Sequence, residues 1–291
     1  MNKRFGFTLA EDATHADMSN KLRRSGFTLA EVLITLGIIG VVAAMTIPTL
    51  IANTNSAKFR SQYKKTLSTL NQAGLMAQAQ YDIDYGATTA ACSAPAEGST
   101  AAKGANDNPD SKLTFCAILN GTLAGATDYG TDSTKVSSKG GTYTWVKTYT
   151  IGSSTSGTGE AAVTTSGVTD AAPSGYIMYG LADGSLIGFP EGAKGCTLAI
   201  GTPLTNDQLK SGGSLNGCIG FIDVNGATLP NKEVACGTGS ATITPPTLNP
   251  ESPCTVGADA NHMTDIYPVV FHDATVEPAT NAAKYVLTTS K

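Results

Sequence analysis

The longest apolar run in the chain covers residues 27–51, where Glu31 is the only charged side chain. A helix over this run would be about 37 Å long, enough to cross the roughly 30 Å hydrocarbon core of a bilayer. The basic residues 21–24 (KLRR) precede it, which predicts a cytoplasmic N-terminus and an extracytoplasmic remainder. The alternative is a secretory signal peptide, but its apolar region would be shorter and followed by a small-x-small cleavage site.

The helical pattern continues beyond the apolar run. Apolar or small residues recur at spacings of three and four and define one helix face: Phe59, Tyr63, Leu67, Leu70, Gly74, Ala77 and Tyr81. We therefore predict one long helix from Phe27 to about Tyr81. Residues 52–82 would form its amphipathic continuation, with the apolar face packed on a globular head at residues 83–291.

The sequence of the head predicts strands joined by turns. Alternating or β-branched segments predict strands at residues 141–151, 176–181, 185–189, 218–224, 266–271 and 285–289. Asp183-Gly184 predicts a two-residue hairpin turn, and Asn225-Gly226 predicts a turn after the fourth strand. Residues 94–111, rich in Ala, Gly, Asn, Asp and Pro, and residues 152–174, rich in Gly, Ser, Thr and Ala, predict surface insertions. The expected fold is α+β: a long N-terminal transmembrane α-helix packed on an antiparallel β-sheet head.

The net charge and the cysteines indicate the environment in which the chain works. The formal net charge of −4 gives no reason to expect a nucleic-acid-binding surface. The cysteines are even in number, dispersed and without C-x-x-C spacing, which favours disulfides in an oxidising compartment over a zinc site. Buried free thiols are the alternative. The cysteines are Cys92, Cys116, Cys196, Cys218, Cys236 and Cys254. Nearest-neighbour pairing, 92–116, 196–218 and 236–254, is one of several possible connectivities.

Glu31 is the unusual residue of the apolar run. A carboxylate inside a membrane segment is costly and marks a functional position unless it lies close enough to the interface to stay hydrated. A cation would neutralise it, and a new N-terminus on a neighbouring copy would supply one. That requires a cut between Gly26 and Phe27.

Residues 23–51, beginning RRSGFTLAE, resemble the N-terminus of type IV prepilins and type II secretion pseudopilins. The resemblance implies that residues 1–26 are a leader, which a prepilin peptidase removes by cutting after Gly26 before it methylates the amino group of Phe27. Glu31 stands at the fifth mature position, where the family carries its signature glutamate. Pro48 stands where such pilins often carry a helix-kinking proline.

The hexapeptide GFTLAE occurs twice, at residues 6–11 and 26–31. Asp12, His15 and Asp17 follow the first copy, so no membrane helix would begin there. The second copy is therefore the working one, and residues 1–17 are either an upstream extension or a mis-assigned start.

The expected function is that of a structural subunit, not an enzyme: a pilin-like protein that assembles into a type IV pilus or a type II secretion pseudopilus. The resemblance implies that the chain is located in the bacterial inner membrane. Its implied partners are prepilin peptidase, other pilin or pseudopilin subunits, the inner-membrane assembly platform and membrane lipid. A role of such a pilus in DNA uptake stays open. The alternative is a membrane-anchored binding protein or enzyme that forms no fibre, but His262 and His272 stand in no hydrolase motif.

Two further sites are open to more than one interpretation. Asp223 and Asn225 would suit a calcium ion, as in the major pseudopilins, but Asp-x-Asn-Gly also suits a hydrogen-bonded turn. Tyr143, Trp145 and Tyr149 share one face of their predicted strand, as a binding platform or as core.

Overall fold

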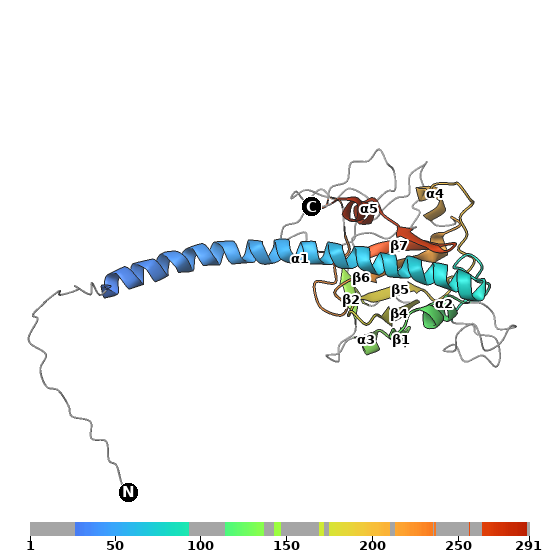
Figure 1. The fold of residues 1–291 in the computed structure, drawn as a ribbon, viewed down its shortest axis with the longest axis horizontal. Coiled ribbons are helices and arrows are strands. Elements are labelled where there is room, and N and C mark those ends of the chain that lie inside the picture. Colours follow the sequence, from blue (N-terminus) through green and yellow to red (C-terminus); the bar gives the residue numbers. More distant parts are fainter. Residues whose placement is uncertain are drawn as a thin grey trace, which may run out of the picture. The chain divides into compact units, whose positions relative to one another are not determined.

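The computed structural model describes residues 27–92, 114–136, 143–146, 169–171, 175–209, 213–234, 236, 256 and 264–289 (Figure 1). The chain divides into two compact units, Met1–Thr46 and Ile47–Lys291, and one helix runs through both. That helix, α1 (Leu29–Tyr81), agrees with the predicted long helix.

The remaining elements belong to the second unit. In chain order they are α2 (Phe115–Thr122), β1 (Thr127–Gly130), α3 (Ser133–Val136), β2 (Thr144–Val146), β3 (Thr169–Ala171), β4 (Tyr176–Gly180), β5 (Leu186–Pro190), α4 (Asn206–Leu209), the 3₁₀ helix η1 (Asn216–Cys218), β6 (Ile219–Asp223), β7 (Ile266–His272), β8 (Thr275–Pro278) and α5 (Asn281–Thr288). An antiparallel sheet has the order β1-β4-β5-β6-β7-β8, and β2 pairs with β3 separately. The predicted α+β class is confirmed.

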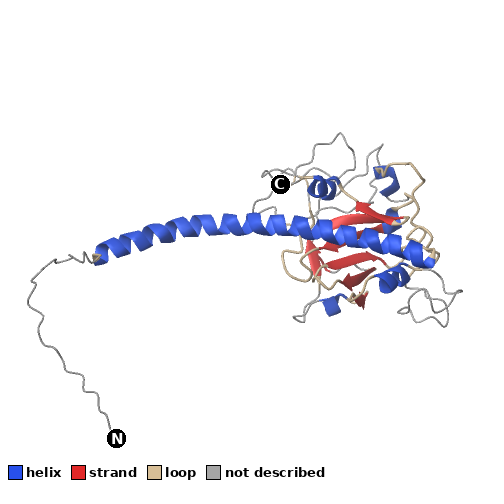
Figure 2. Ribbon diagram, viewed as in Figure 1, coloured by secondary structure: helices blue, strands red, loops and turns tan. Residues whose placement is uncertain are grey.

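The C-terminal half of α1 lies across one face of this sheet (Figure 2). Its apolar face, including Tyr63, Leu67 and Leu70, is buried in the same core cluster as the side chains of β7. Tyr63 stacks on Tyr267 with ring centroids 4.2 Å apart. Burying these large side chains supplies the main driving force that attaches the helix to the sheet.

Two contacts join α1 to the β7–β8 hairpin. The side-chain amide of Asn71 pairs with the backbone of Val276: Nδ2 donates to the carbonyl oxygen at 3.2 Å, and Oδ1 accepts from N–H at 2.5 Å. One turn later, Gly74 lies against the hairpin turn, where a Cβ would stand 2.5 Å from the carbonyl oxygen of Ala274. The close approach of helix and turn therefore depends on the missing side chain of Gly74.

We expect Gly74→Ala to lower the free energy of unfolding by about 1–3 kcal/mol, although alanine is the better helix former. The added methyl group overlaps a backbone oxygen that cannot move without shifting the hairpin. Gly192→Ala is the matched control, because a Cβ there meets nothing within 4 Å. Urea unfolding of the full-length protein in detergent would measure both, and equal stabilities for the two variants would contradict the contact.

Four predicted strands are confirmed at β4, β5, β6 and β7, and the Asp183-Gly184 turn joins β4 to β5 with φ of +86° at Gly184. Of the predicted strand at 141–151, only residues 143–146 are described, including β2. Residues 94–111 and most of 152–174 lie outside the described residues.

The predicted strand at residues 285–289 is wrong, because the chain forms the helix α5 there. Thr280 caps that helix, since its hydroxyl accepts a hydrogen bond from the N–H of Ala283 at 3.2 Å. Ala282, Ala283 and Val286 then bury one helical face. The β-branched residues near the C-terminus suggested a strand, but the capped alanine-rich start determines the structure.

Candidate functional site

The N-terminus of α1 is fixed by a reciprocal contact between Thr28 and Glu31. The backbone N–H and the hydroxyl of Thr28 both donate to Oε2 of Glu31 at 2.8 Å, and the Glu31 N–H donates to the Thr28 hydroxyl at 3.2 Å. This is a capping box, in which residues three apart satisfy each other's backbone donors at the start of a helix. Thr28 therefore holds the carboxylate of Glu31 in one place.

Thr28 is a residue that the sequence analysis missed. The Thr-x-x-Glu spacing of residues 28–31 is itself the signal for a capping box before an apolar run. The Phe27 side chain, directly before the cap, is exposed, and Gly26 lies outside the described residues.

The apolar part of α1 keeps its side chains exposed. Large apolar residues from Phe27 to Ile51 are exposed, and an 18-residue window of the helix has a mean hydropathy of 2.2. By length and composition, α1 is able to cross a membrane. Pro48 lies inside the helix, where it removes one backbone hydrogen bond.

The residues proposed for calcium form a hydrogen-bonded turn after β6. Asp223 is fully buried; its Oδ1 accepts from the Asn225 N–H at 3.0 Å and its Oδ2 from the Tyr143 hydroxyl at 2.5 Å. Asn225 Nδ2 donates to the carbonyl oxygens of Thr228 and Leu229. Among the described residues, no three His, Cys, Asp or Glu side chains are grouped as a metal would require. The turn interpretation accounts for these contacts, and calcium binding stays a hypothesis.

Tyr143 belongs to the core. It is buried and packs parallel to Phe221 at a centroid distance of 6.4 Å. Nothing is described for the side chain of Trp145, and Tyr149 lies outside the described residues. For Tyr143, the core interpretation is therefore the correct one.

A second buried carboxylate, Asp265, interacts with Asp223. Its oxygens accept hydrogen bonds from the backbone N–H groups of Asn231 and Lys232 at 2.9 and 2.7 Å. Burial raises the pKa of Asp265 to about 6, and burial together with the charge of Asp265 raises the pKa of Asp223 well above its usual value. The sequence analysis did not pair these residues, because only the β6–β7 ladder brings them together.

These shifts predict that the head loses stability as the pH rises from 5 to 7. A group whose pKa is raised by folding contributes stability below its unfolded pKa and loses it as the pH passes its folded pKa, so the Asp265 contribution declines between about pH 4 and 6. Burial lowers the pKa of His272, but Glu277 and Asp273 raise it by more, so its pKa in the fold lies above the ordinary value of 6.5. The stability that His272 contributes therefore also declines as the pH rises above 6.5. Glu277 has a lowered pKa, so the stability that it contributes increases with pH, but only near and below pH 4.5.

The measurement is the free energy of unfolding at pH 5, 6 and 7 for the wild type and Asp265→Asn. The variant should have a smaller slope between pH 5 and 6, and burial of Asp223 supplies the slope that remains. His272→Gln should keep the wild-type slope between pH 5 and 6 and have a smaller slope only above pH 6.5. A slope that is the same in Asp265→Asn and in the wild type would contradict the assignment.

The structure contains two disulfides among the described residues, Cys92–Cys116 and Cys196–Cys218, each with Cα atoms 5.9 Å apart. Both agree with nearest-neighbour pairing. Cys236 is also disulfide-bonded, and Cys254 lies outside the described residues.

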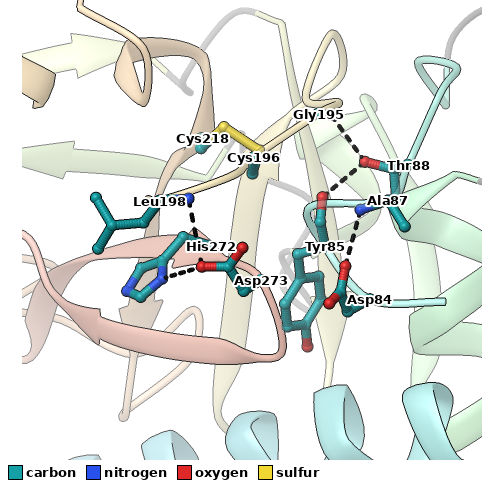
Figure 3. The surroundings of a disulfide bond; sticks show 10 residues. All are labelled: Asp84, Tyr85, Ala87, Thr88, Gly195, Cys196, Leu198, Cys218, His272 and Asp273. Carbon is teal, nitrogen blue, oxygen red and sulfur yellow. Dashed lines mark hydrogen bonds and ion pairs between the residues drawn. A yellow bond between two sulfur atoms is a disulfide. The ribbon is translucent and has the colours of Figure 1, made fainter. Parts of the chain in front are cut away.

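The Cys196–Cys218 bond stands beside the β7–β8 turn (Figure 3). The Asp273 N–H donates to the Cys196 carbonyl oxygen at 2.8 Å, and Asp273 Oδ2 accepts from the Leu198 N–H at 3.3 Å. His272 Nδ1 lies 3.1 Å from Oδ2 of Asp273. The buried His272 therefore takes part in the contacts that hold the β7–β8 turn, and His262 lies outside the described residues.

Comparison with known proteins identifies the N-terminal segment. The family profile described as the prokaryotic N-terminal methylation motif matches residues 21–47, a range that contains Gly26, Phe27 and Glu31. Searches of curated proteins and of solved structures found no match. An apolar N-terminal helix together with this motif fits membrane anchoring. The chain therefore carries the methylation motif that is the signature of the prepilin-type segment of type IV pilins and pseudopilins.

Proposed function

We propose that this chain is a pilin-like structural subunit, which assembles through its N-terminal helix into a type IV pilus or a type II secretion pseudopilus. The observation that carries the proposal is Glu31, which stands inside the matched methylation motif at the start of an exposed apolar helix. A helix that served only as a membrane anchor would not need a carboxylate in its apolar segment, where a charge is energetically costly.

The proposed pathway begins with a cut between Gly26 and Phe27 by a prepilin peptidase. The cut converts the backbone N–H of Phe27 into a free amino group, which the same enzyme methylates and which keeps its positive charge. In the membrane, the amino group of one copy meets the carboxylate of Glu31 on another. Both Thr28 contacts use Oε2 of Glu31, so Oε1 is the oxygen best placed to accept the neighbour's cation.

The ion pair would select the register of assembly. A carboxylate that is buried among apolar helices without a partner is strongly unfavourable, so misaligned copies are penalised by several kcal/mol. The inner-membrane assembly platform and the other pilin or pseudopilin subunits are the partners that this pathway needs. The head, which is carried on the extracytoplasmic side, would have a structural rather than a catalytic role.

The test is the N-terminal mass of the protein from two fractions of its native host, membranes and sheared surface material. We expect a chain that begins at methylated Phe27 in both fractions if the fibre is a surface pilus, and in the membrane fraction alone if it is a pseudopilus. A Gly26 variant that blocks the cut serves as the control and should be absent from sheared material. An intact leader, or a start beyond Ile51, would contradict the proposal.

A further inference from the structure

Among the described residues of the head, large apolar side chains are exposed at two places. Beyond the membrane segment, the described residues include four of them: Leu75 at 58%, Met76 at 45%, Ile200 at 104% and Leu229 at 76% exposed. Single exposed apolar residues are ordinary. Their positions are informative here, because Leu229 lies near one end of the sheet and the other three lie near the opposite end.

The register of the sheet defines the two ends. Leu186, Asp223 and Ile266 lie in one row across β5, β6 and β7, next to the β4–β5 turn. We call this side the β4–β5 end. At the other side, His272 pairs with Thr275 across the turn that joins β7 to β8. We call this side the β7–β8 end.

Helix α1 runs from the first end to the second. Near the β4–β5 end, Lys65 contacts Asp183 in the turn, with Nζ 3.1 Å from Oδ2. Near the β7–β8 end, Gly74 lies against Ala274. Leu75 and Met76, the next residues of α1, therefore lie at the level of the β7–β8 end, and both are exposed.

Ile200 is held at the same end. Its loop is fixed on one side by the disulfide of Cys196, and on the other by the Thr202 N–H, which donates to the Ala199 carbonyl oxygen at 3.0 Å. The Leu198 N–H, which donates to Asp273, ties the loop to the β7–β8 turn (Figure 3). The apolar tip is thus presented by a fixed loop.

Leu229 is presented at the β4–β5 end in the same manner. Asn225 Nδ2 donates to its carbonyl oxygen at 3.1 Å, and the Asn231 N–H donates to Asp265 at 2.9 Å. The backbone on both sides of Leu229 is therefore bound to the end of the sheet, while its side chain points to solvent.

The exposed charges of the two ends are opposite. Lys58, Lys64 and Lys65 are exposed on α1 at or before the β4–β5 end. At the β7–β8 end, Asp82, which is exposed, and Asp84, which is half-buried, follow the last turn of α1, near Asp273. These three carboxylates outnumber the one exposed cation of the neighbouring loop, Lys194. A basic end with one apolar tip therefore faces away from an acidic end with three exposed apolar side chains.

We propose that the β4–β5 end of one copy docks on the β7–β8 end of a second copy, with Leu229 packed against Leu75, Met76 and Ile200. The two surfaces differ, so the contact is heterologous, and a heterologous contact that does not close into a ring propagates as a helical filament. The opposite charges favour this orientation over a contact between like ends. The inference rests on the proposed fibre and adds to it the partner of each end of the head.

Cysteine cross-linking of the full-length chain in its native host tests the contact. Leu229→Cys and Ile200→Cys are expressed as separate chains in one cell, and a short bismaleimide is added to the fibres. Within one copy the two positions are separated by the length of β7, about 23 Å, too far for a disulfide or a short linker. We expect a cross-linked dimer when both variants are present and none when either is expressed alone. Lys284→Cys, exposed on α5, replaces Ile200→Cys as the control and should give none.

Fibre yield provides a second measurement that does not need cysteines. Leu229→Asp and Ile200→Asp should each reduce the protein in the assembled fraction at least tenfold, with the N-terminal cut unchanged, whereas Lys284→Asp should not. Urea unfolding of each variant excludes loss of the fold as the cause.

The outcomes separate the inference from the proposed function. Wild-type fibres with no 229–200 cross-link and normal yields of both aspartate variants would overturn the contact and leave the fibre intact. The same holds if Leu229→Asp and Lys58→Glu weaken binding to vesicles of anionic lipid while fibre yield is normal, because the β4–β5 end would then bind a membrane. A wild-type chain that is neither cut nor assembled would overturn the proposed function itself.

Discussion

Glu31→Ala should leave the chain cut at Phe27 and anchored in the membrane, but reduce its assembly into fibres at least a hundredfold. The physical reason is the unpaired cation: without the carboxylate, the amino group of each neighbouring copy is buried in an apolar bundle with no partner, at a cost of about 3–5 kcal/mol. At 1.4 kcal/mol per factor of ten, that cost corresponds to about two to three and a half orders of magnitude. The measurement is the ratio of assembled to membrane-bound protein.

Two companion variants show whether charge or shape matters. Glu31→Gln keeps the shape and hydrogen-bonding capacity but removes the charge, and should assemble almost as poorly as Glu31→Ala. Thr28→Ala keeps the charge but removes the hydroxyl contacts at 2.8 and 3.2 Å. We expect a loss of a few-fold to tenfold, the size of one helix cap. Normal assembly of Glu31→Gln would refute the ion pair.

Replacing both Cys196 and Cys218 by alanine should lower the free energy of unfolding of the head by about 3 kcal/mol. The bond closes a loop with a sequence separation of 22, and the unfolded chain gains the corresponding freedom when it is removed. The fold also loses an anchor beside the β7–β8 turn, where Asp273 bonds to Cys196 and Leu198. Urea unfolding without reductant is the measurement.

Reductant provides the control for this variant. The wild type should lose stability when reductant is added, and the double alanine variant should lose less, since it retains only the other disulfides. A variant within about 0.5 kcal/mol of the oxidised wild type would show that the loop is held by its hydrogen bonds alone.

The sequence predicted those parts of the fold whose signal is local and repeated. The apolar residues of α1 recur over many turns, and the central strands alternate between well-marked turns, so both were identified. The short helix α5 was not, because Tyr285 and Val286 also suit a strand and the deciding hydrogen bond, from Ala283 to Thr280, comes earlier in the chain. Short elements are decided by one cap or one contact, which periodicity does not show.

The same distinction separates the two candidate sites. The N-terminal segment was recognisable because Gly26, Phe27 and Glu31 are close in sequence and follow a fixed spacing. The carboxylate pair was not, since Asp265 meets Asp223 only through the pairing of β6 with β7. Tyr143, from a third part of the chain, completes that cluster. No spacing in the sequence encodes a contact among three separate segments.

The Asn71 contact has a consequence for solubility. β8 is an outer strand of the sheet, and such a strand exposes backbone groups that invite pairing with another chain and uncontrolled aggregation. Here Asn71 occupies both the N–H and the carbonyl oxygen of Val276. Outward-facing groups alternate along a strand, and the next residue on that side, Pro278, has no N–H to offer. The ordered polymerisation proposed for this chain would thus not compete with amyloid-like growth at this edge.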